Sequence, residues 1–111
     1  MSNPNPMRPQ LLGLVELDLA GNVLYAKLEK EEGRCDLGGL NFFSDVAPFK
    51  NVAEFRRRLE SFANGLEPVK SFSFICDFDD GVVAVKVLVA RIRERTDHNR
   101  IKSLLVHIRP A

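Results

Sequence analysis

The sequence predicts an α+β domain, with a five-stranded antiparallel sheet and helices packed on one face. Three observations lead to this prediction. Several segments alternate apolar and polar residues with the period of two that strands show. They flank one amphipathic helical segment, Asn51 to Asn64. Asp79-Asp80-Gly81 separates two of the alternating segments and is a strong hairpin signal, which gives the order strand, strand, turns, helix and three strands.

A hairpin is expected near the start of the domain. The apolar residues Val15, Leu17 and Leu19 recur at every second position, as in a strand with one buried face. Ala20-Gly21-Asn22 interrupts this pattern as a turn, and Val23 to Leu28 continues as a second strand. The two strands should therefore pair with each other.

The composition suits one compact domain, since the chain has 111 residues of which 45% are hydrophobic. Residues 1–10 are rich in proline and are expected to form a flexible lead, while residues 11–109 form the single domain.

A net charge of +1 excludes nucleic-acid binding through bulk charge. No apolar run approaches the ~20 residues of a membrane helix. Cys35 and Cys76 lack a Cys-x-x-Cys spacing and indicate free thiols, so the predicted location is the cytoplasm.

The helix predicted at Asn51 to Asn64 has marked faces and ends. Its apolar stripe contains Val52, Phe55, Leu59 and Phe62, and the other side carries Arg56, Arg57, Arg58 and Glu60. Asn51 should cap the first turn, with Glu54 completing a capping box. Gly65 is placed for a left-handed stop, and Pro68 prevents continuation. The arginines are interpreted as a solvated face, because glutamates lie within helical pairing distance.

Three strands are expected after the helix. Val69 to Phe78 directs four residues to one side, namely Phe72, Phe74, Cys76 and Phe78. Val82 to Ile92 is apolar on both faces, with Val83, Val85, Val87 and Val89 on one and Val82, Ala84, Leu88 and Ala90 on the other. Ile101 to Ile108 follows a polar connection and places Leu104, Val106 and Ile108 on one side. Because a half-exposed antiparallel strand needs one apolar face, the second face of Val82 to Ile92 predicts a partner surface.

The segment Asn41 to Phe49 carries three aromatic residues and a proline, in the order Asn-Phe-Phe-Ser-Asp-Val-Ala-Pro-Phe. We expect a tight helical turn that presses Phe42, Phe43 and Val46 inward and ends at Pro48. With Glu54-Phe55 downstream, this segment resembles photoactive yellow protein and its relatives in the PAS superfamily. The resemblance implies the PAS fold, with the first hairpin beside the last three strands, and a role in bacterial signal transduction.

The chain departs from the light-sensing members of that group at one position. Their residue after Ala-Pro is the cysteine that holds p-coumaric acid through a thioester, and here it is Phe49, so we expect no covalent chromophore. We expect no other cofactor, but the alternative interpretation of the resemblance is that a non-covalent ligand of unknown identity occupies the PAS cavity. The residues carried over or placed at that cavity are Arg34, Phe42, Phe43, Phe49, Phe55 and Phe72.

Two functions therefore stay open. The first is a signalling and protein-interaction module that is not a photoreceptor and binds a second copy, or another signalling protein, through the outer sheet face. The residues of that interface would be Val82, Ala84, Leu88 and Ala90, with Leu88 at its centre. The second is a sensor of a small ligand, although the large aromatic side chains favour a filled core. An enzyme is not expected, because the sequence has no Ser-His-Asp arrangement or phosphate loop, and neither His98 nor His107 has a second ligand at metal spacing.

Overall fold

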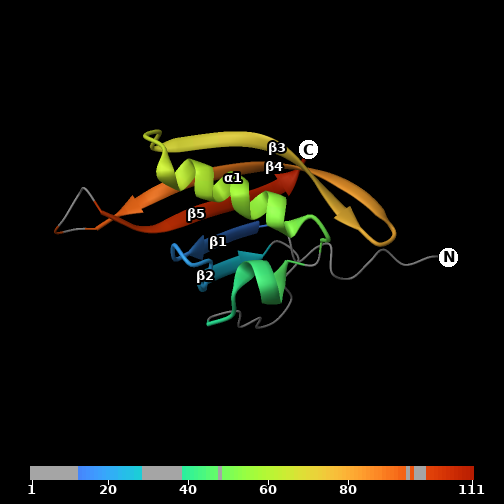
Figure 1. Cartoon of the computed structure of the whole chain (residues 1–111), viewed down its shortest axis with the longest axis horizontal. Coiled ribbons are helices and arrows are strands. Elements are labelled where there is room, and N and C mark those ends of the chain that lie inside the picture. Colours follow the sequence, from blue (N-terminus) through green and yellow to red (C-terminus); the bar gives the residue numbers. More distant parts are fainter. Residues whose placement is uncertain (1–12, 29–38, 48, 95, 97–99) are drawn as a thin grey trace.

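The computed structural model describes residues 13–28, 39–47, 49–94, 96 and 100–111. Its elements are β1 (Gly13–Leu17), β2 (Val23–Leu28), the π-helical turn η2 (Phe42–Val46), α1 (Val52–Asn64), β3 (Val69–Phe78), β4 (Gly81–Arg93) and β5 (Ile101–Pro110) (Figure 1). This order agrees with the prediction. The expected N-terminal lead, Arg34, Cys35 and His98 lie outside the described residues.

The five strands form one antiparallel sheet in the order β2-β1-β5-β4-β3. The first hairpin joins the last three strands through β1 and β5, where Val15 lies opposite Val106. This is the arrangement that the resemblance implied. Helix α1 crosses one face of the sheet, over β4 and β5, while η2 lies beside β2 (Figure 1). The opposite side is called the outer face from here on.

The core lies between α1, η2 and the covered face of the sheet. Its centre is formed by the valines of β4, with Val85, Val87 and Val89 at most 1% exposed. The assignment of these valines to the core is confirmed, as is the inward direction of Phe74, Cys76 and Phe78 on β3 and of Leu104, Val106 and Ile108 on β5. The prediction for Leu19 was wrong: β1 ends at Leu17, so Leu19 belongs to the turn and is 58% exposed.

Aromatic rings fill the space between α1 and the sheet. Phe55 is fully buried, and its ring centroid lies 5.0 Å from that of Phe74, 5.6 Å from Phe49 and 6.1 Å from Phe42. Most of these contacts are edge-on or tilted, which is the favoured geometry for aromatic pairs. The expectation of a core filled by large aromatic residues is therefore confirmed for this part of the chain.

Helix α1 begins differently from the prediction. The Asn51 side chain makes no capping hydrogen bond to the helix. Its Nδ2 donates to the carbonyl of Ile75 at 2.8 Å, and its Oδ1 accepts from the backbone N–H of Asp77 at 3.0 Å. The predicted capping box is thus wrong, because the amide satisfies backbone groups of β3 instead and fastens the helix start to the sheet.

The C-terminal end of α1 also differs from the prediction. Gly65 has φ −91° and ψ −165°, so the expected left-handed stop is wrong. The guanidinium of Arg91, on β4, occupies the place of such a stop and donates to the carbonyls of Phe62, Ala63 and Gly65 at 2.6–3.0 Å. Carbonyls at the C-terminal end of a helix lack hydrogen-bond partners within the helix. A cation there also interacts favourably with the partial negative charge of the helix dipole.

The turn η2 is held by Asn41. The Asn41 side chain accepts hydrogen bonds from the N–H groups of Phe43 and Ser44, and its Nδ2 donates to the carbonyl of Ala20 at 3.0 Å. Phe42 and Val46 are buried as predicted, whereas the ring of Phe43 is only partly buried. The turn ends at Val46, and the next residue, Ala47, is extended. Ala47 precedes Pro48, and helical backbone angles are disfavoured for a residue before proline.

Candidate functional site

The outer face of the sheet exposes the second apolar side of β4. Val82 is 64% exposed and Leu88 is 46% exposed, while Ala84 is exposed and Ala90 is partly covered. On the neighbouring strand, Ile75 is 56% exposed. The structure thus gathers the residues predicted for an interface on one side, opposite α1.

The register of the strands defines how these residues neighbour one another. Ile75 pairs with Ala84, and Leu88 lies between Ser71 on β3 and His107 on β5. Ala90 lies between Val69 and Leu105 in the same way. Apolar residues therefore lie on both sides of the Ser73–Lys86 pair. Several exposed apolar side chains gathered on one face often mark a contact site.

A basic groove lies on the same face. Its volume is about 400 Å³, and it is lined by Ser71, Phe72, Ser73, Lys86, Val87, Leu88, His107 and Arg109. Lys86 and Arg109 are directly opposite each other on neighbouring strands, and neither forms an ion pair within the described chain. The position of Lys86 opposite Arg109 could not be predicted from the sequence, because it depends on the register between β4 and β5.

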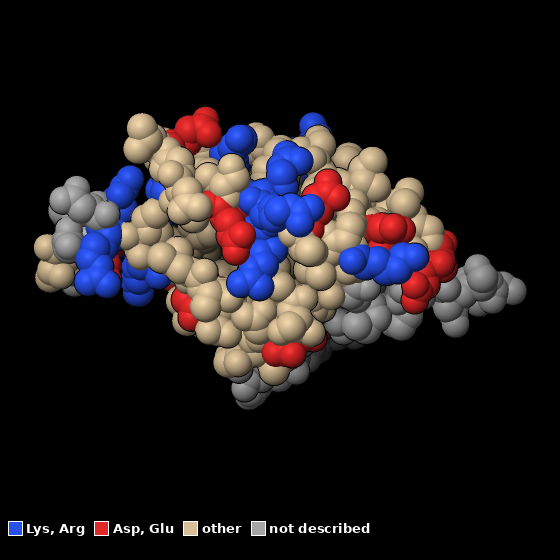
Figure 2. Space-filling model, in the orientation of Figure 1, with Lys and Arg blue, Asp and Glu red and all other residues tan. Residues whose placement is uncertain are grey.

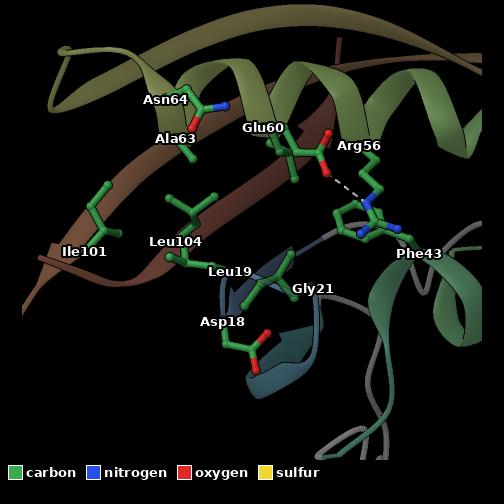
Figure 3. Close-up of a pocket in the computed structure, with 12 residues that line it drawn as sticks. Asp18, Leu19, Gly21, Phe43, Arg56, Glu60, Ala63, Asn64, Ile101 and Leu104 are labelled. Carbon is green, nitrogen blue, oxygen red and sulfur yellow. Dashed lines mark hydrogen bonds and ion pairs between the residues drawn. The ribbon is translucent and has the colours of Figure 1, made fainter.

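A second candidate is the cleft drawn in Figure 3, which lies under the C-terminal half of α1. It holds about 310 Å³ between α1, the β1–β2 turn and the beginning of β5. Buried Leu59 and Leu104 form part of its apolar lining, and Leu19 and Ile101 add exposed or half-exposed surface. Such a lining favours an apolar ligand or side chain.

Charged groups occupy the rim of this cleft. Arg56 donates through Nε to the carboxylate of Glu60 at 3.1 Å and lies over the ring of Phe43, 5.2 Å from its centroid (Figure 3). Partial desolvation would raise the pKa of Asp18, but hydrogen bonds from Asn22 and from the N–H groups of Ala20 and Gly21 outweigh it and hold the pKa below its usual value. The rim charges are thus already committed to partners in the protein.

The residues predicted for a ligand cavity do not gather around one opening. Phe43 lines the cleft, whereas Phe42, Phe49 and Phe55 lie in the buried aromatic cluster. Phe72 is half-buried, with the guanidinium of Arg58 4.3 Å from its ring centroid. Phe49 is 3% exposed, so its ring is packed in the interior.

The helix side of the molecule carries the arginines of α1. Figure 2 shows basic side chains gathered over the middle of this side with acidic ones next to them. Arg56, Arg57 and Arg58 are all exposed, which confirms the prediction of a solvated helix face. Arg56 pairs with Glu60 and Arg58 stacks on Phe72, whereas Arg57 makes no ion pair or ring contact with the described residues.

Reactive groups are scarce in the described chain. Burial raises the pKa of the Cys76 thiol to about 11, so this cysteine stays protonated near neutral pH and acts as a packed core residue. The described residues contain no cluster of three or more His, Cys, Asp or Glu side chains that could hold a metal ion. They also contain no helix with the length and apolar character needed to cross a bilayer.

Comparison with solved structures identifies the fold. The chain superposes on the PAS domain of an HTR-like protein from Haloarcula marismortui with a TM-score of 0.53 and 14% identity, covering 89% of this chain and 80% of that one. It also superposes on the photoactive yellow protein domain of the sensor histidine kinase Ppr from Rhodospirillum centenum, with a TM-score of 0.51, 20% identity and coverage of 88% and 84%.

A further match is the sensor region of a sensor histidine kinase, at a TM-score of 0.53 and 17% identity, where the alignment covers 88% of this chain and 38% of the other. No family model matches the sequence, and no curated protein matches it. The chain therefore has the fold of a PAS domain. A photoactive yellow protein domain is among the structures that it resembles, as the Asn41 to Phe49 segment implied.

Proposed function

We propose that this chain is a signalling module that acts by binding another protein through the outer face of its sheet, and that it is not a photoreceptor. The partner is a second copy of the chain or another signalling protein. The observation that carries the proposal is the exposed apolar surface of β4, with Val82 and Leu88 about half exposed or more on a face that no element of the described chain covers. A signalling role is supported by two of the solved structures with this fold, which come from sensor histidine kinases.

The filled core supports binding rather than photochemistry or catalysis as the mode of action. Phe49 and its neighbouring rings occupy the interior, and the one buried thiol that the structure describes is protonated near neutral pH. A signal would then pass through changes in association at the sheet. The cytoplasmic location stays a prediction.

Chemical shifts recorded as a function of protein concentration test the proposal. Amide signals from Val82, Ala84, Leu88 and Ala90 should move as the concentration rises, while those of Arg57 and its neighbours on the exposed side of α1 should not. Shifts gathered on α1 instead would place the contact on the wrong side of the molecule and overturn the proposal.

A second candidate function is the sensing of a small apolar ligand in the cleft under α1. The specific observation in its favour is an opening of about 310 Å³ with an apolar lining and a polar rim. Native mass spectrometry of freshly purified protein, with an absorbance spectrum, separates the two candidates. A bound compound at a stoichiometric level would support sensing, whereas bare protein at 12.5 kDa or its multiples would favour the interaction module.

A further inference from the structure

The outer face carries two rows of opposite charge. The basic row consists of Lys86 on β4 with Arg109 directly opposite on β5, and His107 adjoins it. The acidic row consists of Asp77 on β3, directly opposite Val82 on β4, and Asp79 follows at the hairpin tip. The carboxylate of Asp79 already pairs with Lys50 at 3.8 Å, so Asp77 is the member of this row that a partner would contact. Val82 and Lys86 are four positions apart on one strand, so the rows are separated by about 13 Å at the usual rise of a strand.

The basic row lacks compensation within the described chain. Like charges directly opposite each other destabilise an antiparallel pair. The ion pairs of the described residues involve Lys50, Arg56, Lys70 and Arg100, and none reaches Lys86, His107 or Arg109. A carboxylate supplied from outside the chain would therefore relieve repulsion on this face.

We propose that the occupant of the outer face is a second copy whose strands run antiparallel to those of the first, so that each basic row lies against the other copy's acidic row. This inference rests on the proposed function. If the two-fold axis ran along the strands, the basic row of one copy would face the basic row of the other, and the like charges would repel. A two-fold axis across the strands reverses the order of the rows and brings Lys86 against Val82 and Asp77 of the second copy instead.

The residues on that axis suit a close approach. An axis halfway between Val82 and Lys86 passes through Ala84, whose register partner is the exposed Ile75. A small residue beside an exposed aliphatic one lets two sheets approach to the usual separation of about 10 Å. Leu88 then lies against the hairpin tip of the second copy, so the centre of the contact is Ala84 rather than Leu88.

Charge reversal on two variants tests this arrangement. In a dimer of Lys86→Glu, each copy would place glutamate against Asp77 of the other copy. In a dimer of Asp77→Lys, each copy would place lysine against Lys86 of the other copy. Each variant alone should dimerise roughly tenfold more weakly than the wild type, since two surface charge contacts reverse in a two-fold dimer. A 1:1 mixture restores both contacts in the heterodimer and should recover wild-type affinity in sedimentation velocity.

Control variants make each outcome decisive. Arg57→Glu reverses a charge on the exposed side of α1 and should leave dimerisation unchanged. Recovery in the mixture, together with weaker wild-type association at high salt, supports the arrangement. Single variants that dimerise normally, or a mixture that stays monomeric, would overturn it. If Leu88→Glu still abolishes the wild-type dimer in that case, the outer face stands as the contact and only the antiparallel arrangement fails.

Discussion

The resemblance of the Asn41 to Phe49 segment to photoactive yellow protein implies that Phe49 stands where the chromophore cysteine would lie. A thioester needs a thiol, and the residue at the attachment position is a phenylalanine packed against Phe55, Phe74 and Phe78. The ring also removes interior volume that a chromophore would need. We therefore expect no covalent chromophore adduct at this position.

Incubation with activated p-coumaric acid should leave this chain colourless. The expected spectrum shows no new band in the visible region after unreacted compound is removed, because Phe49 offers no nucleophile and Cys76 is buried with a raised pKa. A stable yellow adduct that bleaches in light would contradict this expectation and would direct attention to Cys35.

Phe55→Ala should destabilise the fold by ~3–5 kcal/mol, because the ring is fully buried at the centre of the aromatic cluster. Phe43→Ala should cost less, since that ring is only partly buried where it packs against Gly21. Urea melts of the two variants beside the wild type give both values. The account of the core would be wrong if Phe43→Ala proved the more costly change.

Asn51 and Gly65 illustrate the limit of sequence reasoning for single residues. Both stand where local rules place helix caps, yet the Asn51 amide bonds to β3 and Gly65 avoids the left-handed region. In each case the deciding hydrogen bonds come from residues more than 20 positions away. Local capping rules cannot include such partners.

At the scale of elements, α1 is fastened to the sheet at both ends by polar side chains. Asn51 ties its start to β3, and Arg91 of β4 binds three carbonyls at its end while lying 4.6 Å from the ring centroid of Phe62. Between these ends, the buried stripe of α1 packs into the core. The helix and the sheet should consequently unfold together.

Arg91→Leu should lower the free energy of unfolding by about 1–2 kcal/mol. The variant keeps apolar contact with Phe62 but removes charged hydrogen bonds to carbonyls at the helix end, and their value is reduced here by partial exposure. Arg57→Leu is the matched control and should change stability by less than about 0.5 kcal/mol. Equal effects of the two variants in denaturant melts would show that Arg91 does not hold the helix end.

The elements themselves could largely be predicted from the sequence. Alternation placed β3 at its observed bounds and identified the core face of β4, because one buried face imposes a period of two on every strand. The cleft under α1 could not be predicted, since Leu19, Ala63 and Ile101 meet only after the chain has folded. The sequence carried no signal for it, because the alternation placed Leu19 on the buried face of the first strand.

For the whole molecule, the filled interior and the exposed outer face lead to the same conclusion. Among the described residues, seven aromatic contacts link Phe49 with the rings of η2, α1 and β3 or join those rings to one another. β4 shows apolar side chains on the far side of the sheet. The apolar surface that remains available for binding therefore lies on the outer face of the sheet rather than around a central cavity. We therefore expect the chain to associate with its partner through the outer face.

Sedimentation velocity of the wild type, Leu88→Glu and Leu66→Glu tests this claim most directly. Leu66 is 95% exposed in the connection after α1, so it provides the same substitution away from the sheet. We expect the wild type and Leu66→Glu to approach twice the 12.5 kDa chain mass with rising concentration, while folded Leu88→Glu stays at the single-chain mass. A Leu88→Glu variant with an unchanged circular dichroism spectrum and the same self-association as the wild type would contradict the claim.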